Sequence, residues 1–244
     1  CRLALFSRSR LVAWTRITAV AAIAPVHITA LAFTATFATL FAGFVARSVS
    51  PADRTSHFLE SSRDQYTWHA YGLWRFSRSE LADETQRATI REIITAVCER
   101  LERTVRPGET DYHLCREDGK PGLVDKMWLV DPHEIARLPM LYAIGADLTG
   151  EAHWAGKCRE YAEQAARESV LPPATRLAYA FLQQQVSLEA LHELAAAESP
   201  LRAAWGEALE FVAGWLAAFP RQCRQYVPVD VEALDIYRGE VLAL

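Results

Sequence analysis

The chain has 244 residues, 51% hydrophobic and 23% charged, which is ordinary for a soluble globular protein with a sizeable core. Its net charge of −4 conceals an asymmetry, because residues 1–50 carry five arginines and no acidic residue, which leaves a net charge of −9 in the rest. An acidic remainder argues against nucleic acid as a partner. The five cysteines show no CxxC spacing, so we expect neither a zinc site nor a dense disulfide framework. The sequence contains no phosphate-binding glycine loop and no HExxH motif, and we expect no metal and no cofactor.

Residues 17–46 form an apolar run without a charged residue, and four arginines precede it. Such a run is long enough to span a bilayer, which needs about 20 residues, and basic residues before an apolar stretch also resemble a signal peptide. Two other interpretations are an artefact of a misframed gene and a buried helical hairpin. We therefore separate residues 1–50 from 51–244 and expect membrane contact only if 17–46 are a genuine anchor. A genuine leader implies periplasmic or secreted placement, and its absence implies cytoplasmic placement; the oligomeric state stays open.

From residue 51 onward the hydrophobic pattern is helical. Residues 64–76 carry aromatic side chains at five positions, too many for one narrow core stripe, so some should line a surface. Residues 90–105 repeat apolar side chains at i, i+3, i+4 and i+7, which predicts a helix that Pro107 and Gly108 end.

The second half of the chain predicts further helices. Asp131-Pro-His-Glu134 resembles a helix start with Asp131 as N-cap, and Pro139 predicts a kink. Helices are expected near 174–185 and 188–197, with Ser187 as a cap, and then a long amphipathic helix ended by Pro220. Only residues 226–231 alternate weakly as a strand. The chain is therefore predicted to be all-α, built of helical hairpins as an α-solenoid or a closed ring.

The connection at residues 111–133 is the most informative stretch, because it contains four aspartates and two histidines between helical segments. Loops rich in ionisable and aromatic groups on a rigid scaffold often carry chemistry or binding. The competing interpretation is a solvated connection, against which stand the apolar residues Trp128, Leu129 and Val130.

Several motifs resemble one family. They are Asp64-Gln-Tyr-Thr-Trp68, Tyr71-Gly-Leu-Trp-Arg-Phe76, Arg116-Glu-Asp-Gly119, Lys126-Met-Trp128, residues 131–140 and residues 147–154. Together, over about residues 56–170, they resemble the six-hairpin glycosidases, above all the unsaturated glucuronyl hydrolases of glycoside hydrolase families 88 and 105 and the β-glucuronidases of family 154. The resemblance implies an (α/α)6-toroid whose active site lies among the loops at the open end of the ring. Residues 51–244 supply too few helices for six hairpins, so we expect a partial toroid.

Glycoside hydrolysis ordinarily needs one protonated and one ionised carboxyl group. We expect Asp125 to be the acid, because Trp128 beside it would remove hydration and raise the pKa, and Asp64 to be its partner. For unsaturated uronides, the resemblance implies hydration of the ring double bond by an aspartate acid/base.

Other residues of these motifs could bind an oligosaccharide. His69 and His133 could bond a hydroxyl or carboxylate, and Arg116 or Lys126 could pair with a uronate. Trp68, Trp74 and Trp128 could stack on sugar rings. Each has a structural alternative: a core histidine, a solvated charge or a core aromatic residue.

The predicted function is hydrolysis of a uronic-acid-containing carbohydrate. The alternative is a non-catalytic helical scaffold that binds protein or glycan. Convergence of Asp64, Asp125 and His133 in one pocket would favour the enzyme.

Overall fold

The structure is a computed structural model that describes residues 43–48, 50, 52–53, 56–123, 125–172 and 178–226. The helices are α2 (Arg63–Ser77), α3 (Glu84–Thr104), α4 (Arg137–Thr149), α5 (Ala152–Glu168), α6 (Ala178–Leu194) and α7 (Pro200–Tyr226). Within these ranges there is no strand beyond a single bridge between His113 and Lys126, so the all-α expectation is confirmed. The apolar run up to residue 42 and the weak strand beyond residue 226 lie outside the described residues.

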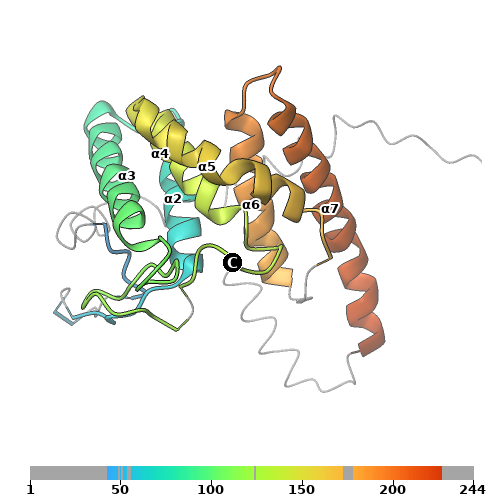
Figure 1. Cartoon of the computed structure of the whole chain (residues 1–244), viewed down its shortest axis with the longest axis horizontal. Helices are drawn as coiled ribbons and strands as arrows, with labels where there is room; N and C mark the ends of the chain where they lie inside the picture. The colour runs from blue at the N-terminus through green and yellow to red at the C-terminus, as the bar shows by residue number, and fades with distance from the viewer. Residues whose placement is uncertain are drawn as a thin grey trace, which may run out of the picture.

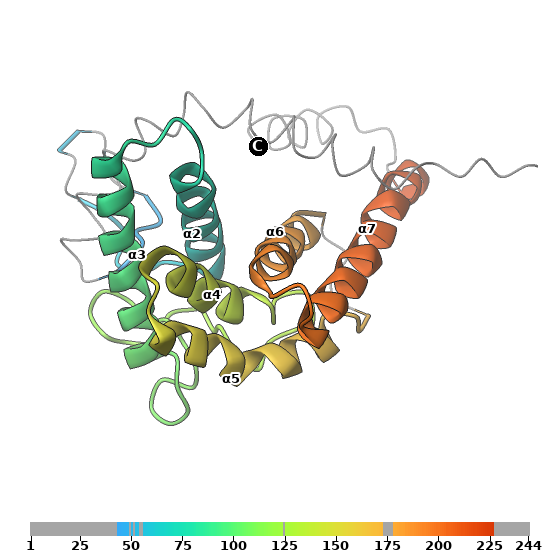
Figure 2. The ribbon, with the colours of Figure 1, turned by 90° about the horizontal axis from the view of Figure 1, so that it is seen from above.

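The helices alternate between two layers. Seen from above, α2, α4 and α6 lie inside an arc, and α3, α5 and α7 lie along its outside (Figure 2). The inner helices α2 and α6 also contact each other directly, because Tyr71 donates a hydrogen bond to Glu189 (3.0 Å) and Arg75 to Glu193 (2.7 Å). Residues 105–136, which we call the α3–α4 loop, lie beside the N-terminal end of α2 (Figure 1).

Helix α3 forms where its sequence predicts a helix. Asp83 and Gln86 form a reciprocal capping box at its start, which satisfies two backbone N–H groups that would otherwise lack partners. The predicted apolar stripe is buried, including Ile90, Ile93 and Leu101. Burial of such side chains is the main source of helix stability in a small domain, at about 1.5–3 kcal/mol for each fully buried side chain.

The aromatic side chains of α2 separate as their crowding predicted. Tyr66 and Trp74 are buried, Tyr71 is half-buried against α6, and Trp68 remains 41% exposed. One helix therefore supplies both core and surface aromatic groups, and Trp68 is the exposed one.

Aromatic rings also join α4 and α5 into one core. The Tyr142 ring stacks on Trp154 (6.1 Å between ring centroids) and on Tyr161 (6.2 Å). Trp128 of the α3–α4 loop packs edge-on against Tyr161 at 4.7 Å. The loop is thus anchored in the core by its own tryptophan.

Three helix boundaries differ from the sequence expectations. Residues 132–136 form turns rather than an α-helix, with the Glu134 N–H donating to Asp131 O (2.8 Å), and α4 begins only at Arg137. Pro139 therefore falls in the first turn of α4, where a proline removes no intrahelical hydrogen bond. The physical reason for the kink expected from the sequence is thus absent.

Ser187 is interior to α6, where its hydroxyl donates to Gln183 O (2.9 Å) one turn back, so the predicted pair of helices is a single helix. Helix α7 continues through Pro220 to Tyr226. An interior proline removes one intrahelical hydrogen bond, and a helix of 27 residues can lose one without ending.

No helix in the described ranges is long and apolar enough to cross a membrane.

Candidate functional site

The N-terminal ends of α2 and α4 meet beside the α3–α4 loop. Asp64 lies in the first turn of α2, and Arg137 is the first residue of α4. The first turn of a helix presents unpaired N–H groups and a positive dipole end, which favour carboxylates such as Asp64. Asp64 and Arg137 are therefore positioned by helices and not by the loop.

Five ionisable residues form one network here, which we call the Arg137 network: Arg63, Asp64, His133, Glu134 and Arg137. The Arg137 guanidinium lies 2.5 Å from Asp64 Oδ1 and 3.5 Å from Glu134 Oε1. Arg63 approaches the same Glu134 oxygen at 2.8 Å, and His133 Nε2 lies 3.7 Å from it. One guanidinium therefore bridges two carboxylates, and a second guanidinium and an imidazole approach one of them.

The network is largely removed from solvent. The Arg137 side chain is 1% exposed, whereas the Asp64 side chain is 35% exposed and forms its open edge. His133 and Glu134 are buried. Moving charges out of water costs several kcal/mol per ion, and only a well-bonded partner offsets that cost.

Burial also changes the protonation of this network. It raises the pKa of Glu134, although the guanidinium groups of Arg137 and Arg63 oppose the shift. It lowers the pKa of His133 to about 4, and Arg137 adds to the effect. His133 is therefore a neutral imidazole at pH 7, whereas Glu134 is the carboxyl group in the network whose burial favours its protonated form.

Two atoms of the network have hydrogen-bonding capacity left. His133 Nδ1 and Arg137 Nε are buried without a partner in the described part of the chain. Buried polar atoms are nearly always bonded in native proteins. Each of these two atoms could therefore form one further hydrogen bond.

Asp125 belongs to a second cluster. Its carboxylate accepts from Gly122 N–H (3.0 Å) and lies 2.6 Å from His113 Nδ1. The link to the Arg137 network runs through Arg63, whose guanidinium donates to Lys126 O at 3.2 Å. Asp64 and Asp125, the two predicted carboxylates, thus both lie near the N-terminal end of α2 but have different partners.

Of the predicted ligand-binding residues, His133 lies in the Arg137 network and Trp68 lies one helical turn after Asp64 on the same face of α2. His69 is half-buried, and burial lowers its pKa to about 4. All three therefore lie near the N-terminal half of α2 or the start of α4.

The remaining predicted residues have other partners. Lys126 pairs with exposed Asp111 (2.7 Å), and Arg116 lies between Glu60 (3.6 Å) and Asp118 (3.2 Å). Trp128 is a core residue. We do not include these three in the candidate site.

Sequence reasoning missed Arg63, His113, Glu134 and Arg137. Glu134 was interpreted only as part of a helix cap, yet Glu134 and Arg137 have the i, i+3 spacing that brings opposite charges together on a helical turn. That spacing beside a histidine was the available signal. Arg63 and His113 gave none, because their partners are distant in the sequence.

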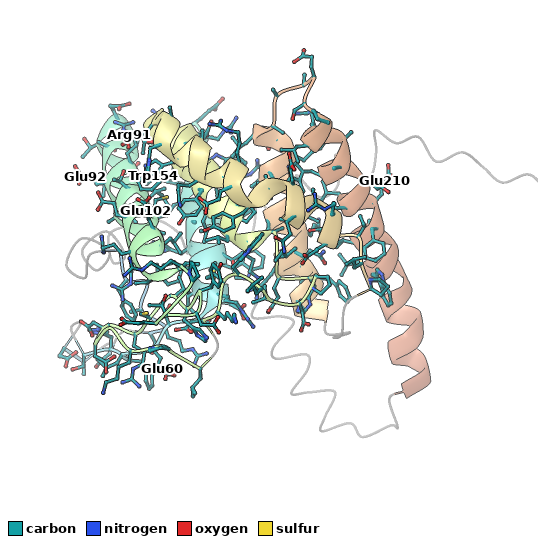
Figure 3. All side chains as sticks on the ribbon, in the orientation of Figure 1. Glu60, Arg91, Glu92, Glu102, Trp154 and Glu210 are labelled. Atoms are coloured by element: carbon teal, nitrogen blue, oxygen red, sulfur yellow. The ribbon has the colours of Figure 1, made fainter. Side chains whose placement is uncertain are left out.

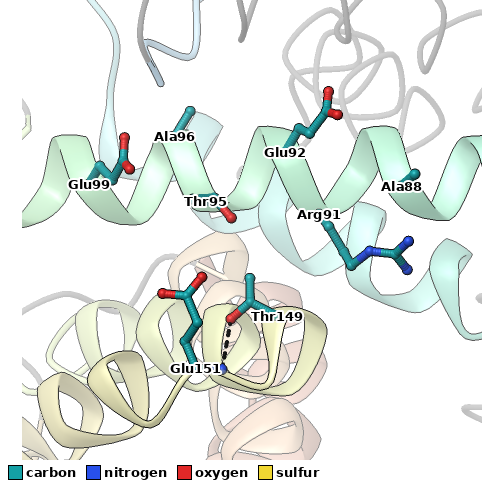
Figure 4. A pocket seen from close by; sticks show the side chains of 8 residues that line it. All are labelled: Ala88, Arg91, Glu92, Thr95, Ala96, Glu99, Thr149 and Glu151. Carbon is teal, nitrogen blue, oxygen red and sulfur yellow. Dashed lines mark hydrogen bonds between the residues drawn. The ribbon is translucent and has the colours of Figure 1, made fainter.

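A surface depression lies elsewhere on the molecule. It has a volume of about 590 Å³ and lies between α3 and the α4–α5 turn, where Arg91, Glu92, Glu99 and Glu151 line it (Figure 4). Arg91 and Glu92 lie near the top of the view in Figure 3, whereas Glu60, which pairs with the loop residue Arg116, lies near the bottom. No predicted site residue lines this depression, and the described residues contain no cluster of three potential metal ligands.

No family model matches the chain, and comparison with curated proteins and with solved structures gives no match.

Proposed function

We propose that the chain is a glycoside hydrolase acting on a uronic-acid-containing carbohydrate, either a β-glucuronide or an unsaturated glucuronyl oligosaccharide. The observation that carries the proposal is the Arg137 network, in which two carboxyl groups of unequal burial share one guanidinium at the open edge of two helix ends. Glycosidases use such a pair, one group as acid and one ionised.

Glu134 is the acid in this proposal, in place of Asp125. Burial favours its protonated form, and a protonated carboxyl group can release the leaving oxygen. Asp64 is the ionised partner, because it accepts a hydrogen bond from Arg137, and it stabilises the positive charge that develops on the sugar ring.

Substrate recognition follows from the neighbours of this pair. The Arg63 side chain remains partly exposed, and a guanidinium binds a uronate carboxylate through two parallel hydrogen bonds. Trp68 presents an exposed ring one turn from Asp64, where an apolar sugar face could stack.

An incomplete (α/α)6-toroid is part of the same proposal. Alternation of inner and outer helices along an arc supports it (Figure 2), since each hairpin of such a ring contributes one inner and one outer helix. The direct α2–α6 contact means that these three inner helices enclose little space between them. The substrate would therefore approach the helix ends rather than a wide central channel.

The test is hydrolysis of aryl β-glucuronides and unsaturated uronic-acid disaccharides, with an aryl β-glucoside as the neutral control. We expect turnover of a uronide and none of the glucoside, and a loss of 10²-fold or more in Asp64→Asn and Glu134→Gln. Turnover of the glucoside alone would contradict uronide recognition by Arg63.

The second candidate is a binding scaffold without catalysis. Phe58 (64% exposed), Leu123 (85%) and Leu129 (57%) present apolar side chains from segments beside the same helix ends, and aliphatic and aromatic groups of this kind often contribute to binding surfaces. A folded chain that binds a uronic-acid oligosaccharide but cleaves none of the panel would favour this candidate.

A further inference from the structure

In the second cluster, which lies on the α3–α4 loop, a buried carboxylate orients the imidazole ring of His113. Asp125 is 1% exposed, and its two oxygens have separate partners: His113 Nδ1 at 2.6 Å and the Gly122 N–H at 3.0 Å. The His113 side chain is 21% exposed. A buried carboxylate that accepts from Nδ1–H fixes the ring orientation and leaves the Nε2 lone pair as the base.

The loop backbone is shaped around this pair. Asp111, Tyr112 and Cys115 all adopt left-handed conformations, with φ of 43°, 63° and 58°, on either side of His113. Such conformations are unfavourable for residues other than glycine and concentrate at functional sites. A side chain at Gly122 would place its Cβ 2.1 Å from Asp125 Oδ2, so the approach of the backbone N–H to the carboxylate requires glycine.

The pair is also connected to the Arg137 network. His113 and Lys126 form an antiparallel bridge, and the Lys126 carbonyl accepts a hydrogen bond from Arg63, which in turn pairs with Glu134. The bridge therefore joins the His113 backbone to the segment that contacts Arg63, and Arg63 contacts the proposed acid.

We propose that His113 is the base of the proposed hydrolysis and that Asp125 positions it; the assignment rests on the proposed function. Asp64 is unsuited to that role because Arg137 lies 2.5 Å from the carboxylate. An imidazole whose Nδ1–H is held by a carboxylate can accept a proton at Nε2, which suits it to the role of a general base.

The proposed hydrolysis requires only water, His113 and Glu134. Water transfers a proton to His113 Nε2 while its oxygen bonds to the anomeric carbon of a β-glucuronide. The glycosidic C–O bond breaks, and its electron pair stays on the leaving oxygen, which takes the Glu134 proton. Solvent then removes the proton from His113, and Glu134 regains one.

Asp125→Asn tests the positioning role in a specific way. Because the Gly122 N–H needs an acceptor at Oδ2, the asparagine carbonyl takes that place and its NH₂ group faces His113 Nδ1. The imidazole then carries its proton on Nε2 and cannot act as a base. ¹⁵N NMR of the labelled chain without substrate should show Nδ1–H in the native protein and Nε2–H in Asp125→Asn.

The kinetic test uses aryl β-glucuronide with His113→Gln, Asp125→Asn and His57→Gln. His57, which precedes α2, pairs with Glu117 of the α3–α4 loop at 2.8 Å, so it is the matched control for a merely structural histidine–carboxylate contact. We expect kcat to fall 10²-fold or more in His113→Gln and in Asp125→Asn, with KM unchanged. The pH profile of His113→Gln should lose its acidic limb. His57→Gln should keep the native kcat.

Retained kcat in His113→Gln, or an equal loss in His57→Gln, would overturn the assignment while the proposed function stands. An unchanged tautomer in Asp125→Asn would overturn the positioning role. No turnover by the native chain on any uronide of the panel would overturn the proposed function, and this assignment with it.

Discussion

The two ends of α2 carry the same kinds of group in opposite surroundings. At the N-terminal end, Arg63 and Arg137 pair with Asp64 and Glu134. At the C-terminal end, a second set, the Arg78 set, pairs Arg75 and Arg78 with Glu193 and Asp147. All four side chains of the Arg78 set are 33–43% exposed, whereas Arg137 is 1% exposed.

This difference separates two uses of arginine–carboxylate pairs. Exposed pairs contribute roughly 0–1 kcal/mol each and here connect α2 with α4 and α6. Buried pairs lose hydration and stabilise a fold only when each partner is satisfied, yet two atoms of the Arg137 network lack a partner among the described residues. A costly, incompletely satisfied network is characteristic of functional sites.

The largest expected difference is in stability. Arg137→Met should lower the free energy of unfolding by about 3–5 kcal/mol, because Asp64 and Glu134 lose the guanidinium between them. Arg78→Met should cost at most about 1 kcal/mol. Urea unfolding measures both, and equal costs would mean that burial does not distinguish the two ends.

The next effect is a pH dependence that should be larger at the buried end, because burial lowers the pKa of His133 more than that of His192, the neighbour of Glu193 in the Arg78 set. The folded pKa of His133 is lowered to about 4, below the unfolded value near 6.5, so the unfolded chain binds the extra proton. The contribution of His133 to the free energy of unfolding is therefore complete above pH 6.5 and is lost as the pH falls towards 4. Its slope is at most about 1.4 kcal/mol per pH unit.

His133→Gln should reduce that slope, measured by urea unfolding between pH 4 and 6.5. His69, whose pKa burial also lowers to about 4, contributes in the same direction, whereas the raised pKa of Glu134 opposes it. Exposed His153, paired with Glu102, is the control, and an equal change in His153→Gln would refute the account.

High salt should weaken the exposed ion pairs and leave the buried pairs nearly unchanged, which is a smaller effect. Glu193→Gln removes an exposed partner of Arg75, so its cost should be at most about 1 kcal/mol and should vanish at 1 M salt, where the Debye length is about 3 Å. The cost of Arg137→Met should persist at 1 M salt. A salt-insensitive cost in Glu193→Gln would show that the Arg78 set is not solvent-screened.

The smallest stability effect should come from Trp68→Ala. Its ring is exposed, so unfolding should change by about 0.5 kcal/mol or less, whereas KM for a uronide should rise if the ring stacks on the sugar. Native KM in this variant would remove Trp68 from the proposed site.

Sequence periodicity predicted the helical elements well where one face is buried. The apolar residues from Ile90 to Leu101 predicted α3 correctly, because their helical spacing places them on one buried face. Boundaries failed where tertiary contacts decide: Asp131-Pro-His-Glu134 forms turns, and Glu134 pairs there with Arg63 and Arg137. The motifs located Asp64 and His133, but Asp125 has His113 as its partner. That pairing depends on a loop bridge that periodicity does not encode.

The most direct test of the central claim compares Glu134→Gln with Glu193→Gln on an aryl β-glucuronide at equal folded concentration, verified by circular dichroism. We expect kcat/KM to fall by about 10²–10⁴ in Glu134→Gln and to be unchanged in Glu193→Gln. Equal kcat/KM in the two variants would contradict the proposal that the Arg137 network is the hydrolytic site.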